Sequence, residues 1–168
     1  MSDDPRLFDV RLLDVPLVLR ERSRQQGAEL LREMTLITTG LDAGTTCHDA
    51  PRRLVKLARE LETVYGPYVA TSTDEMDAAL DRGEETLAQV VYTLPASSVA
   101  FVRHVAAILA EVEEYCRTGD ALLTLAPPDE VAAYRQWSIS EVERQYAGHP
   151  ATSWPAFAAA RAGGTPPR

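Results

Sequence analysis

Hydrophobic and polar residues repeat one arrangement three times along the chain. A short apolar run is followed by a proline and then by a longer amphipathic stretch, in VRLLDVPLVLRERSRQ (Val10–Gln25), VVYTLPASSVAFVRHV (Val90–Val105) and ALLTLAPPDEVAAYRQW (Ala121–Trp137). Alternation with a period of two is typical of a half-buried strand, and a period near 3.6 is typical of a helix. Proline can open a helix because its ring presets φ and its missing N–H would be unpaired there. The pattern therefore predicts strand–proline–helix units.

Two of the strands are indicated by clear alternation. Phe8, Val10 and Leu12 alternate with charged residues, and TLAQVVYTL places Val90 and Tyr92 on one face. The third strand, Ala121–Ala126, stays open because periodicity alone cannot settle so short an apolar run. Strand–helix–strand connections of this kind favour parallel neighbours with a right-handed crossover. We therefore expect parallel pairing.

Helical spacing predicts the remaining elements. A first helix should run from Leu17 to about Thr39, and a second should end at Gly66 and Pro67, which are helix-terminating residues. Ser72 and Glu75 have the spacing of a capping box, which predicts a third, short helix ending at Gly83. Two long helices should follow the later prolines, and the tail offers a short helix capped by Ser153.

These elements predict one α/β domain over residues 1–150. Its small sheet of two or three strands should be covered by about five helices, because each amphipathic helix can cover the strand before it. A chain of 168 residues is ample for one domain and short for two. Residues 151–168 are expected to form a C-terminal tail with a possible short helix and a disordered end.

Composition excludes several classes of function. The net charge of −8 would be repelled by phosphate backbones, so nucleic-acid binding is disfavoured. The sequence has no apolar run near the ~18 residues that a membrane span needs. The acidic start, MSDDPRLFD, does not have the pattern of a secretory signal, so the expected compartment is the cytoplasm.

Residues that could carry chemistry are scattered. Cys47, His48 and Asp49 are consecutive, but consecutive side chains usually point in different directions, and we interpret them as a loop followed by a helix cap. The sequence contains no phosphate-binding glycine loop, no nucleophile elbow and no metal-ligand spacing. We therefore expect no enzymatic activity, no metal site and no cofactor.

Trp137 is the most informative candidate. On a helical wheel it lies away from the stripe of Val131, Ser138 and Val142 and beside Glu141 and Arg144, with Tyr134 at the edge. A large aromatic side chain on the outer side of a helix needs a cover. The tail could provide it through Trp154 and Phe157, or a partner surface could, because Trp and Arg anchor many interfaces. Tyr134, Trp137, Glu141 and Arg144 are therefore the predicted partner-binding residues.

Three blocks of the chain resemble a known family. They are VRLLDVPLVLRERSRQQGAELLREMTLI, ALDRGEETLAQVVYTLPA and CRTGDALLTLAPPDEVAAYRQWSISEVERQYAG. Together they resemble an uncharacterised family of small actinobacterial proteins found near anti-sigma serine kinases and their antagonists. That family has no assigned catalytic residues. The resemblance implies a regulatory role only because such proteins are found near those kinases and antagonists.

The expected function is therefore that of a non-enzymatic cytosolic regulatory protein that binds another protein. The resemblance implies sigma-factor partner-switching signalling as its setting, and a homo-oligomer remains open. The alternative is a small-molecule sensor or an enzyme. Its pocket would lie between the sheet and the helix that starts at Pro95, near Tyr92 and His104. A cavity of several hundred Å³ with a few converging polar groups would favour this alternative.

Overall fold

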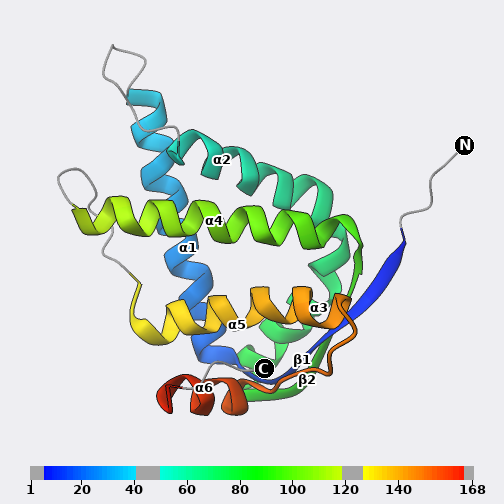
Figure 1. Cartoon of the computed structure of the whole chain (residues 1–168). Coiled ribbons are helices and arrows are strands. Elements are labelled where there is room, and N and C mark those ends of the chain that lie inside the picture. The colour runs from blue at the N-terminus through cyan, green and yellow to red at the C-terminus, as the bar shows by residue number, and fades with distance from the viewer. Residues whose placement is uncertain (1–5, 41–49, 119–126, 165–168) are drawn as a thin grey trace, which may run out of the picture.

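A computed structural model describes residues 6–40, 50–118 and 127–164 of the chain (Figure 1). The elements in chain order are β1 (Leu7–Pro16), α1 (Leu17–Gly40), α2 (Ala50–Glu60), the π-helical segment η1 (Leu61–Tyr65), α3 (Gly66–Asp81), β2 (Thr86–Pro95), α4 (Ser97–Thr118), α5 (Asp129–Tyr146) and α6 (Trp154–Ala162). The predicted α/β class is confirmed: a small sheet is covered by helices. The proposed third strand, Ala121–Ala126, and the Cys47–His48–Asp49 run lie outside the described residues.

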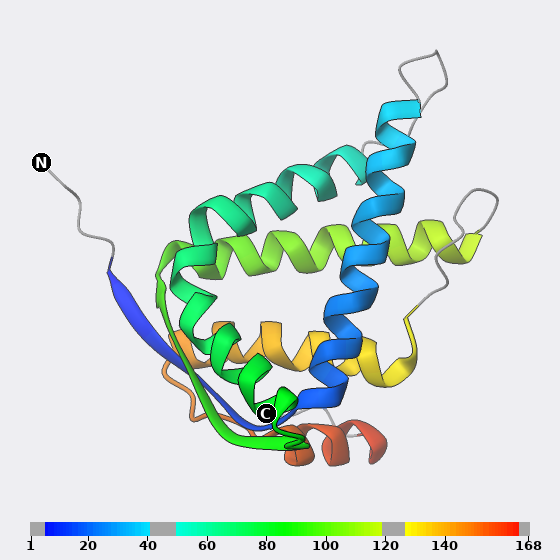
Figure 2. The ribbon, with the colours of Figure 1, turned by 180° about the vertical axis from the view of Figure 1, so that it is seen from behind.

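The sheet consists of β1 and β2, and its strands are antiparallel. Val10 pairs with Tyr92, and Pro16 pairs with Thr86. The expected parallel pairing is therefore wrong. The reason is the path of the chain between the strands, because α1 leads away from the end of β1 and α3 returns to that same end (Figure 2). The Leu17 N–H donates to the Glu85 carbonyl at 2.9 Å and closes this end of the sheet.

The alternation in β1 changes phase at one residue. Val10 and Leu12 are buried before Asp14, whereas Val15 and Leu17 are buried after it. Asp14 has a φ of 54°, a left-handed conformation that Asp tolerates better than most residues. This turn of the backbone moves the buried side chains from even to odd positions, so that the end of β1 and the start of α1 share one core.

The second predicted helix does not stop at Gly66 and Pro67. The π-helical segment η1 joins α2 to α3, and Pro67 lies in the first turn of α3, where its missing N–H is not needed. Ser72 is not a cap, because it lies inside α3 and its hydroxyl donates to the Val91 carbonyl at 2.6 Å. Both corrections have one cause: α3 begins earlier than expected and is bonded to β2 through Ser72.

The other helices follow the prolines closely. α1 starts directly after Pro16, α4 starts two residues after Pro95, and Pro128 is the N-cap residue of α5. Ser153 is the N-cap residue of α6 but makes no side-chain cap hydrogen bond; its carbonyl accepts from the Phe157 N–H at 3.0 Å. Tail residues 151–164 therefore continue the packed structure, since α6 contacts β1 and α5. The end of the tail that was expected to be disordered, residues 165–168, lies outside the described residues.

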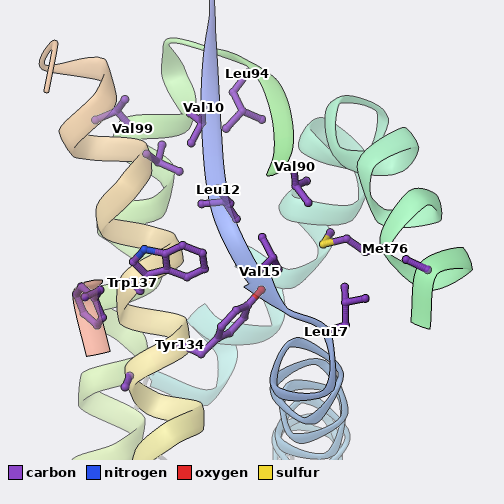
Figure 3. Packing of buried hydrophobic residues seen from close by; sticks show 14 residues of the cluster. Val10, Leu12, Val15, Leu17, Met76, Val90, Leu94, Val99, Tyr134 and Trp137 are labelled. Carbon is purple, nitrogen blue, oxygen red and sulfur yellow. The ribbon is translucent and has the colours of Figure 1, made fainter. Parts of the chain in front are cut away.

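Buried hydrophobic residues form two clusters. The sheet core lies between the strands, α3, α5 and α6 (Figure 3) and comprises Val10, Leu12, Val15, Leu17, Met76, Ala79, Val90, Leu94, Val99, Ala133, Tyr134, Trp137, Val142 and Phe157. The frame core lies between α1, α2, η1 and α4 and comprises Leu30, Met34, Leu54, Leu57, Tyr65, Phe101 and Ile108. In Figure 2, α4 and α5 both cross α1.

Candidate functional site

Trp137 faces the sheet and is completely buried, with 0% of its surface exposed. Figure 3 shows its indole beside β1, close to Leu12. The indole N–H donates to the Thr152 carbonyl at 2.9 Å. The expectation that Trp137 lies on the outer side of the helix is therefore wrong. A helical wheel identifies the apolar stripe of α5 but does not show that the strands pack against the side next to that stripe.

The tail covers Trp137, which was one of the two predicted covers. Trp154 lies edge-on to Trp137 and to Tyr134, with ring centroids 5.7 and 5.9 Å away. Phe157 is buried and stacks on Trp154 at 6.1 Å. Ser153 forms an isolated parallel bridge with Leu13, so the tail also lies along the free edge of β1. Aromatic pairs in these arrangements add to the free energy of simple burial.

Glu141 connects α5 to the tail and is fully buried. Its Oε2 accepts from the Gln145 side-chain amide at 2.8 Å and from the Thr152 N–H at 3.0 Å. Its Oε1 lies 3.6 Å from the Arg144 Nε. A buried carboxylate needs such partners, because the transfer of an unpaired charge out of water is costly. Helix and tail are therefore held together by a polar contact as well as by aromatic packing.

Gln145 extends this contact to the strand. Its amide nitrogen donates to the Arg11 carbonyl at 2.8 Å, and its amide oxygen accepts from the Arg11 N–H at 2.9 Å. The side chain thus takes the place of a neighbouring strand at the open edge of β1. Sequence reasoning did not find Gln145, because its role depends on where α5 crosses the strand.

The four predicted partner-binding residues therefore lie together, but on the face that contacts the sheet and the tail. Tyr134 is buried, and this burial raises the pKa of its phenol above the usual range. Arg144 is half-buried and donates to the Thr152 hydroxyl at 3.4 Å. A partner could reach Trp137 only if residues 151–164 moved.

The alternative pocket has a counterpart in the structure. A cavity of about 180 Å³, which we name the inner cavity, lies between β2, η1, α3, α4 and α5. It is smaller than the several hundred Å³ that would favour the alternative. Tyr92 lines it, as expected, whereas His104 is exposed on α4 and does not line it. His104 was predicted from its position between Phe101 and Ile108, but those residues turn to the frame core and leave it in solvent.

The wall of the inner cavity is apolar apart from hydroxyl groups. Its other lining residues include Leu61, Tyr65, Phe101, Val102 and Val142. Ser98 is buried, and its Oγ makes no hydrogen bond within the described part of the chain. Burial raises the pKa of Tyr92 to about 12, so its phenol is neutral near neutral pH. The accessible wall of the inner cavity is thus almost entirely apolar.

The π-helical segment η1 forms one side of this cavity through Leu61 and Tyr65. Single π-helical turns occur frequently at functional sites. A second apolar space, the frame cavity, measures about 220 Å³ and shares Leu61 and Ile139 with the inner cavity. The apolar spacing of Leu57, Leu61 and Tyr65 indicates a helix but does not distinguish an α turn from a π turn, so sequence reasoning missed η1.

Neither metal sites nor membrane spans are found in the described ranges. No group of three or more His, Cys, Asp or Glu side chains there could hold a metal ion. No helix among the described residues is long and apolar enough to cross a membrane. Comparisons of the chain with protein-family models, with curated proteins and with solved structures find no match.

Proposed function

We propose that the chain is a non-enzymatic, ligand-binding regulatory protein whose ligand occupies the inner cavity. The observation that carries this proposal is the apolar inner cavity beside Ser98, a lining residue whose buried Oγ has no hydrogen-bond partner among the described residues. An unsatisfied buried hydroxyl costs roughly 1–3 kcal/mol. The Ser98 Oγ is itself covered, so a ligand would recover this free energy once the Ser98 side chain turned its hydroxyl into the cavity.

The lining supports binding rather than catalysis. Within the residues that line the inner cavity there is no His, Asp, Glu, Lys, Arg or Cys. Ser98 therefore has no general base beside it, and Tyr92, with its pKa raised to about 12, stays protonated. The fitting ligand is a small, mostly apolar molecule with one hydrogen-bonding group. An engineered apolar cavity of ~150 Å³ can hold benzene, so 180 Å³ is enough for a substituted ring.

The test uses phenol and benzene as a pair of probes that differ by one hydroxyl. Amide chemical shifts of the labelled full chain are followed in a titration with each probe. Ser98→Ala should weaken phenol binding about threefold to tenfold and leave benzene binding unchanged, because one hydrogen bond contributes about 1 kcal/mol. Thr71→Ala is the control that removes a hydroxyl elsewhere, since Thr71 is exposed and does not line the cavity.

Two results would contradict this proposal. One is the absence of saturable shifts around the inner cavity with either probe. The other is an equal loss of phenol and benzene binding in Ser98→Ala, which would indicate a general loss of packing. Val102→Phe should fill the cavity and abolish binding of both probes while the chain stays folded.

A second candidate function is favoured by the tail. We propose that residues 151–164 mask a protein-binding face that contains Tyr134, Trp137, Glu141 and Arg144. The support for this proposal is that the tail takes the place that a partner would occupy, with Trp154 against Trp137 and the Thr152 backbone on Glu141. The resemblance to proteins found near anti-sigma kinases supports a cytoplasmic partner-switching role.

This second candidate is tested by releasing the tail. Phe157→Asp would place a charge in the sheet core and should detach α6. The detached variant should bind a purified anti-sigma kinase or its antagonist more tightly than the wild type, and adding Arg144→Ala should remove the gain. Equal binding by both forms would contradict it. Light scattering of the same variant would reveal a second copy as the occupant instead.

A further inference from the structure

A third space lies on the other side of α5 from the sheet. This outer cleft measures about 500 Å³ and is lined by residues of α4, α5 and α6. Its apolar lining comes from α4 and α5 and includes Ala106, Leu109, Ala110 and Ile139. Several of these residues are alanines, which leave room between the helices. The volume lies in the range of ~300–1,000 Å³ that is usual for small-ligand sites.

Arginines surround this apolar lining. Arg135, Arg144 and Arg161 line the cleft together with one carboxylate, Glu143. The Glu143 carboxylate accepts from the Arg103 Nε at 3.1 Å, and the Arg144 Nε lies 3.6 Å from the Glu141 Oε1, so both of these charges have an opposite charge beside them. The chain as a whole has a net charge of −8, so a cleft whose charged lining residues are three arginines and one glutamate runs against its composition. A locally positive potential concentrates anions.

The third arginine comes from the tail. Arg161 lies in the last turn of α6, and its Nη1 donates to the Gln136 Oε1 at 2.6 Å. A guanidinium carries five N–H donors, so this bond leaves others for a ligand. The docked position of α6 therefore completes the cleft, and an anion held by Arg161 and α5 would also stabilise that position.

We propose that the outer cleft is a binding site for an amphipathic organic monoanion, a carboxylate with an apolar chain or ring. The planar guanidinium groups match the geometry of a carboxylate, and the apolar lining formed by Leu109 and Ile139 takes the hydrocarbon part. Glu143 in the lining disfavours a second negative charge. This inference is independent of the inner cavity, because it uses other polar residues and a ligand of different charge.

Titration calorimetry of the full chain with octanoate, octanol and octylammonium tests this site. Octanoate should bind saturably at one site, and the neutral and cationic probes should bind at least about tenfold more weakly, because charged hydrogen bonds contribute about 1.5–3 kcal/mol. Arg161→Ala should weaken octanoate by a similar factor. Arg59→Ala is the matched control, since Arg59 is an exposed helical arginine outside the cleft.

A second variant tests whether detachment of α6, and not loss of the arginine itself, explains weaker octanoate binding in Arg161→Ala. Ala110→Phe leaves every arginine in place and fills the cleft, so it too should abolish octanoate binding. Equal affinity for octanoate and octanol would overturn the proposal, and so would an equal loss in Arg59→Ala. If Ser98→Ala removed octanoate binding, the anion would occupy the inner cavity and the outer cleft would be rejected. If phenol did not bind in the inner cavity but octanoate bound as expected, the proposed function would be rejected and the outer cleft would still be supported.

Discussion

The two cores of this protein are packed differently. In the sheet core, Val10, Val15 and Trp137 are fully buried, and strands, helices and tail close around them. The frame core is bordered by the frame cavity of about 220 Å³, and the inner cavity of about 180 Å³ lies where the two cores meet. Packed helices lie ~8–10 Å apart and need large side chains to fill the space between them. Ser23, Gly27 and Ala58 line the frame cavity and are small.

The comparison teaches that the space for a ligand lies beside the frame core and at its border with the sheet core, not inside the sheet core. Close packing without large voids maximises dispersion contacts, and the loss of any part of it is costly. A void between helices forgoes those contacts and leaves space for a ligand. The predictions that follow test this contrast, from the largest expected effect to the smallest.

Trp137→Ala should lower the free energy of unfolding by about 3–5 kcal/mol. The reason is that the side chain is fully buried in the sheet core and its N–H is bonded to Thr152. Urea unfolding followed by circular dichroism measures the change. Tyr146→Ala is the control, because Tyr146 is 45% exposed on the same helix and should cost less than about 1 kcal/mol. A loss below about 1 kcal/mol for Trp137→Ala would remove the distinction between the cores.

Tyr92 gives a pH-dependent test where the sheet core meets the inner cavity. Burial raises its pKa to about 12, whereas a tyrosine in the unfolded chain ionises near pH 10. The stability that comes from its bound proton is complete below about pH 10 and is lost as the pH rises toward about 12. In Tyr92→Phe, the fall in unfolding free energy over this range should be smaller by an amount on the order of 1–2 kcal/mol.

Urea titrations at a series of pH values check this expectation. Tyr134 also has a raised pKa from burial, so part of the alkaline loss should persist in Tyr92→Phe. An unchanged pH profile in the variant would mean that Tyr92 is open to water. The inner cavity would then be a solvent channel.

Gly27→Ala should stabilise the chain by about 0.5–1 kcal/mol. Gly27 lies inside α1 beside the frame cavity, and a Cβ there would meet nothing within 4 Å. Gly83→Ala is the matched control, because its φ of 81° penalises any side chain although the space around it is also empty. The two thermal midpoints should therefore move in opposite directions. A downward shift for Gly27→Ala would show that the frame cavity is filled.

Much of the local structure could be predicted from residue spacing. Val10 and Leu12 alternate with charged residues and do form a strand, and the stripe that begins at Leu17 does form a helix. Pro16 and Pro95 also marked the two described strand-to-helix transitions correctly within two residues. Ser72 shows the limit of such local rules, because its capping-box spacing is real but its hydroxyl bonds across the fold to Val91.

What the sequence by itself determined is the set of strands and amphipathic helices, because periodicity and proline geometry act between residues a few positions apart. Only the tertiary structure decided the antiparallel pairing, the face of α5 that meets the sheet, and the cover over Trp137. These depend on contacts between residues far apart in the chain, such as Gln145 with Arg11. The cavities have the same origin, since a void is a property of how several helices cross and no single helix encodes it.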